Sequence, residues 1–470
     1  MVFSSTLFLF VFLPITLFGY YLVKEKFANY WLLFVSMLFF AWSQPHYLWI
    51  ILLNILVNYS CALLIRDHPR ARKYILALCV LTNLSILYYF KYFDFTLDSL
   101  NKLLGCQFTL RDIVLPIGIS FFTFQGMSYV IDVYREDVKA QKDIFKVALY
   151  IVLFPQLIAG PIVRYKDIAQ EIDDRAVTID DFSSGIERFI IGLSKKAILA
   201  NTLAVTADAI WGNGAGNNTW LTAWVGSIAY TLQIYFDFSG YSDMAIGLGR
   251  MFGFHFNENF NLPYTSQNIT EFWRRWHISL STWFRDYVYI PLGGNRKRVY
   301  LNLGIVFLLT GIWHGASWHF IAWGVWNGFF ILLERLIRNR KKGPKKNMSV
   351  LGKAISKFYA LLVIHFGWVL FRAPHTRDAL LFVESMLGKM RFSGSGYTLF
   401  WYLDKWTITV LIVAVLAASS IPQRAGELLR QHLSERVWIC LRYVSLLAML
   451  CIAMLRIVSG TYNPFIYFQF

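Results

Sequence analysis

The feature that most constrains this chain is a series of apolar runs, each about as long as a membrane is thick. A helix needs about 20 predominantly apolar residues to cross the hydrocarbon core of a bilayer, and such runs recur along the sequence. Charged residues make up only 16% of the 470 residues, against about 25% in a soluble domain. The runs lack the alternating strands of about ten residues that a transmembrane barrel requires. We therefore expect an all-α polytopic membrane protein.

The positive charge of the chain follows the apolar runs. A formal net charge of +17 would suggest nucleic-acid binding in a soluble protein. Here the basic residues cluster in short loops, at Lys24 and Lys26, at residues 66–73 and at residues 338–346. This is the positive-inside pattern of membrane topology, so we assign these loops to the cytoplasm and the N-terminus to the outside. We expect contact with membrane lipids and no nucleic-acid partner.

The sequence indicates one continuous membrane domain. Neither a Ser/Pro/Gly-rich linker nor a clear internal repeat divides residues 1–470, and we expect about ten to twelve transmembrane or re-entrant helices. The site core is predicted at residues 240–335, and residues 338–346 form the predicted cytoplasmic basic loop. Pro, Gly and Ser within residues 115–124 predict a broken helix there. The five scattered cysteines form no metal-binding spacing and are expected to be free thiols.

An embedded histidine marks the first candidate functional stretch. His314 lies within the almost unbroken apolar run 301–333, and an ionisable group in such a run is by default functional. His319 lies about 140° further around a helix, so the two cannot share a metal as an i, i+4 pair does, and we expect no metal site. Gly315 and Ala316 would leave room beside His314 for a substrate, and imidazole is the natural base near neutral pH. Spacing alone leaves open a core histidine bonded to a backbone carbonyl.

The second candidate stretch is dense in aromatic and charged residues. If residues 269–289 form one helix, one stripe is largely aromatic and a second is polar. The aromatic stripe holds Trp273, Trp276, Leu280, Trp283 and Tyr287, and the polar stripe holds Arg274, His277, Ser281 and Arg285. Such a helix either lines a wet cavity or anchors the chain at the interface, with its arginines on lipid phosphates. We expect this stretch and that of His314 to form one site.

A glycine-rich basic loop follows. Gly293 and Gly294 precede Asn295, and Arg296 begins a run of three cations. Glycines let backbone amides approach an anion, so a phosphate-bearing substrate would fit this loop. The alternative is another positive-inside loop, which the residues by themselves favour.

Several stretches in this order resemble one family. They are LPIGISFFTFQGMSYVIDVYR (115–135), FPQLIAGPIVRY (154–165), FWRRWHISLSTWFRDYVYIPLGGNR (272–296), TGIWHGASWHFIAWG (310–324), FGWVLFRA (366–373) and the aromatic terminus 465–470. Together they resemble the membrane-bound O-acyltransferases, and most of all the bacterial branch that acetylates exopolysaccharides. The resemblance covers essentially the whole chain.

The resemblance implies a fold and a set of site residues. The fold would be a ring of transmembrane helices around a thinned centre, with a tunnel in which a cytoplasmic acyl donor meets an acceptor. His314 would be the catalytic histidine and His277 the second motif residue. Some relatives have a further histidine where this chain has Asn327, so a role for that position is in doubt. The residues expected to bind substrate are Trp313, Trp273, Arg274, Ser281, Asn295 and Arg296.

The resemblance also implies a reaction. The protein would lie in the inner membrane of a bacterium. Acetyl-CoA, as donor substrate, would enter its tunnel from the cytoplasm, with the phosphates of CoA near residues 295–298. His314 would act as general base on an acceptor hydroxyl, and His277 would orient the thioester or donate to the oxyanion. No bound cofactor is expected. The acceptor would be a polysaccharide of alginate or cellulose type, or a periplasmic acetyltransferase partner protein.

Other functions stay open at this point. Peptidoglycan O-acetylation is the nearest rival, because relatives perform it with the same motifs, whereas D-alanylation of teichoic acid fits the motifs less well. Two alternatives belong to other classes of function. One is a transporter or export subunit with His314 as proton relay, and the other is a membrane scaffold. The inverted repeats common in transporters are not evident in the sequence.

Overall fold

The computed structural model describes residues 1–340, 348–389, 398–460, 462–463 and 466. Most of the predicted basic loop 338–346 and of the aromatic terminus 465–470 therefore lies outside the described residues. The described chain is helical, without a strand, and its cysteines are free. It packs as two compact units, one of Met1–Phe189 with Tyr241–Glu258 and the other of Ile190–Gly240 with Asn259–Phe470.

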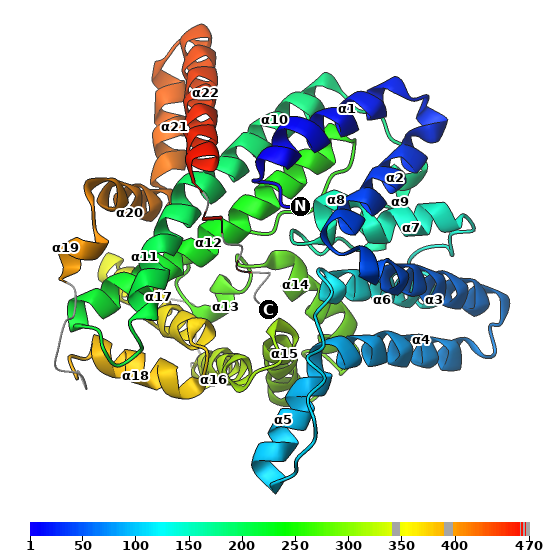
Figure 1. Cartoon of the computed structure of the whole chain (residues 1–470), viewed down its shortest axis with the longest axis horizontal. Coiled ribbons are helices and arrows are strands. Elements are labelled where there is room, and N and C mark those ends of the chain that lie inside the picture. The colour runs from blue at the N-terminus through cyan, green and yellow to red at the C-terminus, as the bar shows by residue number, and fades with distance from the viewer. Residues whose placement is uncertain (341–347, 390–397, 461, 464–465, 467–470) are drawn as a thin grey trace. The chain divides into compact units, whose positions relative to one another are not determined.

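The helices of the first unit that precede α10 (Ile179–Ser194) lie between Phe8 and Asp173 (Figure 1). They are η1 (Phe8–Phe12), α1 (Leu13–Leu22), α2 (Glu25–Ser43), η2 (Pro45–Tyr47), α3 (Leu48–Asp67), α4 (Arg72–Leu87), η3 (Tyr88–Tyr92), α5 (Phe93–Leu104), α6 (Ile119–Tyr134), α7 (Ile144–Val152), α8 (Phe154–Leu157) and α9 (Tyr165–Asp173). The break predicted at residues 115–124 lies before a helix, since α6 begins only after Gly118, which adopts a left-handed backbone with φ +76°.

A buried asparagine cluster joins three helices of the first unit. Asn54 of α3 donates to Asn83 of α4 at 2.8 Å, and Asn83 donates back to Asn58 of α3 at 3.1 Å. Gly126 of α6 lies against the same side chains, and a Cβ at this position would be 2.4 Å from Asn58 Nδ2. Small residues and amide pairs of this kind hold helices together where lipid offers no hydrophobic driving force.

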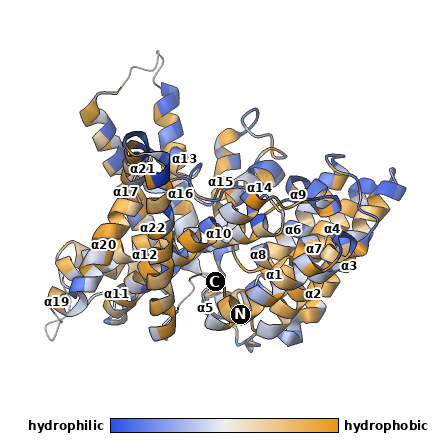
Figure 2. Ribbon diagram, turned by 90° about the horizontal axis from the view of Figure 1, so that it is seen from above, coloured by the Kyte–Doolittle hydropathy of each residue, from blue (hydrophilic) through white to orange (hydrophobic). Residues whose placement is uncertain are grey.

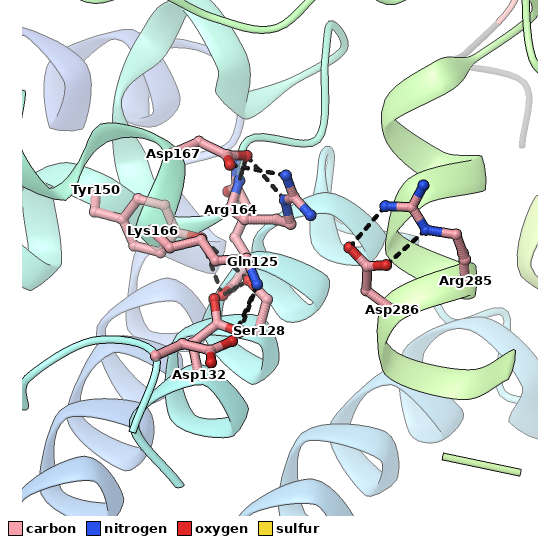
Figure 3. A network of polar contacts seen from close by, with 10 residues as sticks. Gln125, Ser128, Asp132, Tyr150, Arg164, Lys166, Asp167, Arg285 and Asp286 are labelled. Atoms are coloured by element: carbon pink, nitrogen blue, oxygen red, sulfur yellow. Dashed lines mark hydrogen bonds and ion pairs between the residues drawn. The ribbon is translucent and has the colours of Figure 1, made fainter. Parts of the chain in front are cut away.

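Two of the stretches that carry the family resemblance meet in a second polar network of this unit (Figure 3). The Tyr150 hydroxyl donates to the Val163 carbonyl at 3.0 Å and lies 3.2 Å from the Ser128 hydroxyl. Lys166 approaches the fully buried Asp132 at 3.6 Å. Arg164 forms a paired contact with Asp167, at 2.8 and 2.9 Å. These contacts tie the start of α9 to α6 and α7.

The second unit contains the predicted site core from Asn259 onwards. Its helices are η4 (Lys195–Ala200), α11 (Asn201–Gly212), η5 (Pro263–Thr265), α13 (Ile269–Phe272), α14 (Ile278–Phe284), η6 (Arg285–Tyr289), α15 (Val299–His314), α16 (Trp318–Arg340), α17 (Val350–Arg372), α18 (Thr376–Met386), α19 (Leu399–Tyr402), α20 (Lys405–Ala417), α21 (Ile421–His432) and α22 (Glu435–Ser459). Two helices, α10 (Ile179–Ser194) and α12 (Trp220–Met251), continue from one unit into the other. Helix α12 is 32 residues long.

The protein is a polytopic membrane protein. Within the described residues, six helices are long and apolar enough to cross a membrane, or seven if the bent pair α20 and α21 counts as one span. This number is smaller than the predicted ten to twelve, because helices such as α15 and the η1–α1 segment are apolar but short. Figure 2 shows hydrophobic residues along α2, α3 and α20. On α22 side chains such as Leu447 and Leu455 are exposed, as expected where lipid is the solvent.

Helices α15 and α16 form a tight hairpin because glycines lie at their contact. A Cβ at Gly311 would be 2.5 Å from the Phe320 carbonyl oxygen, and one at Gly324 would be 2.6 Å from that of Phe307. Backbones can approach this closely only where side chains are absent. The hairpin fixes the end of α15, where His314 is the last helical residue.

Candidate active site

His277 lies at a sharp break in the chain. The prediction of one helix over residues 269–289 is wrong: α13 ends at Phe272, α14 begins at Ile278, and the segment continues as the π-helix η6. His277 itself has a left-handed backbone, with φ 45° and ψ 54°. A non-glycine residue rarely adopts this conformation, and it persists only where its surroundings impose it. The stripes deduced for a continuous helix therefore do not hold across this break.

Asn259 imposes the conformation at His277. Its backbone carbonyl accepts from Ile278 N at 3.0 Å, and its side-chain Oδ1 accepts from Ser279 N at 3.3 Å and Ser279 Oγ at 2.9 Å. His277 Nδ1 lies 3.1 Å from the same Oδ1. Asn259, His277 and Ser279 are all buried. One asparagine thus holds both the backbone and the ring of the turn.

The start of α13 is fixed by a carboxylate from α16. Glu334 Oε1 accepts from Ile269 N at 2.7 Å, and its Oε2 accepts from Thr270 N at 3.1 Å. Negative charge at the first turn of a helix satisfies backbone amides that have no partner within the helix. The segment that contains Trp273 and His277 is therefore attached to α16 at one end and to Asn259 at the other.

His314 lies in an aromatic enclosure at the end of α15. Its ring meets those of Trp323 on α16 and Phe371 on α17 edge to face, with centroids at 4.9 and 5.1 Å, and only 6% of the residue is exposed. The idea that Gly315 leaves room for a substrate is wrong. A Cβ at Gly315 would lie 2.2 Å from the Phe320 ring, so the glycine makes room for Phe320.

The two candidate histidines belong to one cluster within the second unit. The His277 ring lies 6.1 Å from that of Trp313, which adjoins His314. Burial lowers the pKa of His277, which lies outside the candidate membrane spans, and the neighbouring His314 lowers it further. His277 is therefore neutral near pH 7. The structure brings His277, Trp313 and His314 together.

Three further predicted residues line one cavity. Trp273, Arg274 and Ser281 bound a space of about 210 Å³ between the α13–η6 segment and α15, together with Arg285 and Tyr289. The rest of the lining is mainly apolar: Leu280, Phe284, Leu303, Val306, Phe307 and Ile331, with Thr270 and Thr310. The Trp273 ring packs 5.5 Å from Trp323, the residue that also touches His314. One tryptophan thus connects the cavity wall with the histidine enclosure.

The remaining predicted residues, Asn295 and Arg296, lie on the exposed loop after η6. Asn295 Oδ1 accepts from the Tyr289 hydroxyl and from Arg335 Nη2, both at 3.0 Å. Asn295 is thereby joined to the cavity through Tyr289. The backbone amides of Gly294 and Arg296 donate to carbonyls within the segment. Since these amides are already bonded, any anion at this loop would be held mainly by its cationic side chains.

Sequence reasoning missed Asn259, Glu334 and Trp323. Asn259 and Glu334 are polar residues beside aromatic or apolar stretches, a weak signal of buried hydrogen bonding, yet only the fold shows what they bind. Asn327 is buried and donates to the Trp323 carbonyl at 2.9 Å. Among the residues that the structure describes, no three His, Cys, Asp or Glu side chains are grouped to hold a metal.

A membrane protein with two histidines in one buried aromatic cluster, which Trp323 and Trp273 connect to an apolar cavity with arginines in its lining, fits acyl transfer at the membrane. The model of the membrane-bound O-acyltransferase family matches residues 122–372, and the chain belongs to this family. It is therefore an acyltransferase, which sets aside the transporter and scaffold alternatives.

Within the family, the chain is similar to bacterial proteins that are named as O-acetylases or O-acetyltransferases. The chain is 42% identical, over its full length and that of the relative, to a probable alginate O-acetylase AlgI of Pseudomonas putida. It is 47% identical to the probable alginate O-acetylase AlgI of Pseudomonas aeruginosa, over 82% of this chain and 75% of the relative. It is 36% identical to a peptidoglycan O-acetyltransferase of Helicobacter pylori, over 83% of this chain and 80% of the relative.

Proposed function

We propose that this protein transfers acetyl groups from cytoplasmic acetyl-CoA across the bacterial inner membrane for the O-acetylation of an exopolysaccharide of alginate type. The cluster of His277, Trp313 and His314, which Trp323 connects to Trp273 in the cavity wall, is the observation that carries the proposal. The full-length similarity to probable alginate O-acetylases supports the acetyl group and the polymer. A ring of helices with a central tunnel is the architecture in which such a transfer would occur.

The donor is assigned to the cavity lined by Trp273, Arg274 and Ser281. Its apolar wall suits the acyl end and the pantetheine arm, and its arginines suit the phosphates of CoA. Arg296 and its neighbours on the exposed loop extend this positive charge towards the cytoplasm. Trp313 lies beside both histidines and would face the reacting thioester. Arg274→Gln is expected to raise KM for acetyl-CoA roughly 3–10-fold while kcat stays nearly unchanged, as for a uniform binding contact.

His314 acts as the general base. It takes the proton of the acceptor hydroxyl, whose oxygen attacks the thioester carbonyl carbon and forms the ester. The carbon–sulfur bond breaks, and the proton on His314 passes to the leaving CoA thiolate. General base catalysis of this kind contributes about 10²–10⁴-fold. The aromatic enclosure excludes water, which protects the thioester from hydrolysis.

His277 orients the reactants. Two roles were expected for it, orientation and donation to the oxyanion, and the Asn259 contact favours the first. A neutral imidazole whose Nδ1 donates to Asn259 has a lone pair on Nε2 and accepts a hydrogen bond there. The acceptor hydroxyl is a suitable donor to that lone pair.

The acceptor is either the polysaccharide or a periplasmic partner protein that passes the acetyl group on. A second candidate function is O-acetylation of peptidoglycan, favoured by the 36% identity to the Helicobacter pylori enzyme. Both use the same chemistry in the membrane protein and differ in what receives the acetyl group.

The test uses the purified full chain in sealed proteoliposomes with acetyl-labelled acetyl-CoA on one side. Alginate oligosaccharides or peptidoglycan fragments are supplied on the other side, with and without candidate periplasmic acetyltransferases, and CoA release and labelled ester are measured. The proposal predicts CoA release coupled to label on the alginate oligosaccharides. Label on peptidoglycan alone would favour the second function, and no CoA release in any combination would overturn both.

A further inference from the structure

One hydrogen-bonded group controls which nitrogen of His277 holds the proton. The Asn259 amide contacts Ser279 N, Ser279 Oγ and His277 Nδ1 through the same atom, at 3.3, 2.9 and 3.1 Å. The backbone N–H of Ser279 is a donor only, so the atom it meets must be the amide oxygen. The orientation of the Asn259 side chain is therefore fixed by its surroundings.

An amide oxygen only accepts hydrogen bonds. Ser279 Oγ also lies 3.5 Å from His277 Nδ1, but its one proton goes to Asn259 Oδ1 over the shorter distance of 2.9 Å. The His277 nitrogen 3.1 Å from the amide oxygen is then the donor, which puts the ring proton on Nδ1 and the lone pair of the neutral ring on Nε2. The alternative tautomer would face two lone pairs towards each other in a buried setting, at the cost of a lost buried hydrogen bond.

The backbone around His277 is fixed from the same segment. Asn259 accepts from Ile278 N at 3.0 Å, and Asn261 N donates to the Arg275 carbonyl at 2.9 Å. The contacts lie on both sides of the left-handed residue and prevent the turn from relaxing into a helix. The ring of His277 is further located by Phe238, whose ring meets it edge to face at 4.6 Å.

We propose that Asn259 is a positioning residue of the acetyl-transfer reaction, which holds His277 in the Nδ1–H tautomer so that Nε2 presents a lone pair to the reactants. The kinetic part of this inference rests on the proposed function. The tautomer does not, because it is a property of the resting protein.

The tautomer is measured by nitrogen NMR of the full chain in nanodiscs with ¹⁵N-labelled histidine. The His277 signals are those that disappear in His277→Gln. We expect a protonated Nδ1 and an unprotonated Nε2 in the wild type, and loss of this pattern in Asn259→Ala. Asn259→Asp retains the accepting oxygen and adds a negative charge, so it keeps the tautomer and raises the pKa of His277.

Kinetics supply the second readout. Asn259→Ala is expected to lower kcat roughly 10–100-fold, as for other groups that orient a functional histidine, with little change in KM for acetyl-CoA. Asn259→Asp should recover part of kcat and shift the pH–rate profile towards higher pH. The control is Asn218→Ala, which removes an equally buried asparagine that caps the carbonyls of Ile210 and Gly214. It should change neither the His277 signals nor kcat.

Two results would overturn the inference. One is a protonated Nε2 in the wild type, and the other is an Asn259→Ala protein with wild-type ring signals and no greater loss of kcat than Asn218→Ala. If the wild type fails to consume acetyl-CoA, the proposed function fails, and the ring signals still decide the role of Asn259.

Discussion

Two regions of the second unit hold a buried histidine in different ways. At the α12–α17 contact, His365 lies 3.0 Å from the hydroxyl of Thr231 through Nδ1 and 3.0 Å from that of Ser227 through Nε2. Its ring lies parallel to Trp224 at 5.3 Å, within regular helices. In the other region, His277 has a left-handed backbone conformation between the short helices α13 and α14, and its Nδ1 contacts Asn259 Oδ1.

The two regions use the same side chain for different purposes. A ring bonded through both nitrogens to one facing helix is a link between helices, as polar side chains in membranes often are. A ring whose tautomer is fixed by an amide, at a backbone position that costs free energy, has the features of a functional site. The strain at His277 is maintained because Asn259 and Glu334 hold the segment from both ends.

Replacing His277 and His365 in turn gives the largest expected difference between the two regions. His277→Gln should lower kcat for acetyl transfer on the order of 10²-fold, because the lone pair that orients the acceptor is lost. His365→Leu should leave kcat nearly unchanged and destabilise the fold by about 1–2 kcal/mol, because two buried hydrogen bonds are lost. Steady-state kinetics and thermal unfolding in the same nanodiscs measure both. A loss of kcat in His365→Leu equal to that in His277→Gln would abolish the distinction.

We also expect acetyl transfer to fall when a substitution elsewhere on α15 moves the His314 side chain but leaves the residue itself unchanged. Gly311→Val would place side-chain atoms against the Phe320 carbonyl, which a Cβ alone would approach to 2.5 Å. Overpacking of this kind costs about 1–3 kcal/mol, and the shift of α15 should lower kcat as well.

Gly304 on the same helix is the matched control, since a Cβ there has nothing within 4 Å. Gly304→Ala should leave kcat unchanged and stabilise α15 by up to about 1 kcal/mol. If both glycine variants behave alike in the unfolding and activity assays, the close contact of α15 with α16 does not position His314.

A third histidine sharpens the comparison, with the smallest effect. His255 in the first unit lies 2.8 Å from Glu171 through Nδ1 and 3.0 Å from Asp181 through Nε2. The hydrogen bond to Asp181 raises the pKa of His255, and Glu171 raises it further. Because the pKa of His255 is higher in the folded state, protonated His255 stabilises the fold. This contribution is complete at pH values below the unfolded-state pKa of about 6.5, and it is lost as the pH rises through the folded-state pKa.

The wild type should therefore exceed His255→Gln in stability at pH 6 by about a few tenths of a kcal/mol, and by less at pH 9. The effect is small because the His255 side chain is half exposed, so that solvent and salt screen its contacts with both carboxylates. Thermal unfolding at the two pH values measures it. An equal difference in stability between wild type and His255→Gln at pH 6 and pH 9 would show that the fold does not stabilise protonated His255.

Much of this molecule could be predicted from its sequence, because lipid imposes long apolar helices with few alternatives. Helices α3, α16, α17 and α22 are long and apolar enough to cross a membrane, as the apolar runs of the sequence predict. The grouping of His277 with Trp313 and His314 followed from their exceptional composition within apolar surroundings.

The break at His277 could not be predicted in this way. Residues 273–277 are compatible with a helix, and the left-handed turn is imposed by Asn259, eighteen positions earlier. Glu334 acts on α13 from sixty-five positions away. Contacts over such separations leave no periodic pattern, and the role of Gly315 was misjudged because Phe320 folds back onto it.

We propose that the cluster of His277 and His314 transfers acetyl groups, with His314 as the general base. Its most direct test is single-turnover CoA release from acetyl-CoA by the wild type, His314→Ala and His365→Leu in nanodiscs, with acceptor present. We expect the rate of CoA release to fall about 10²–10⁴-fold in His314→Ala and to stay near that of the wild type in His365→Leu. A His314→Ala protein that remains folded and releases CoA at the wild-type rate would contradict it.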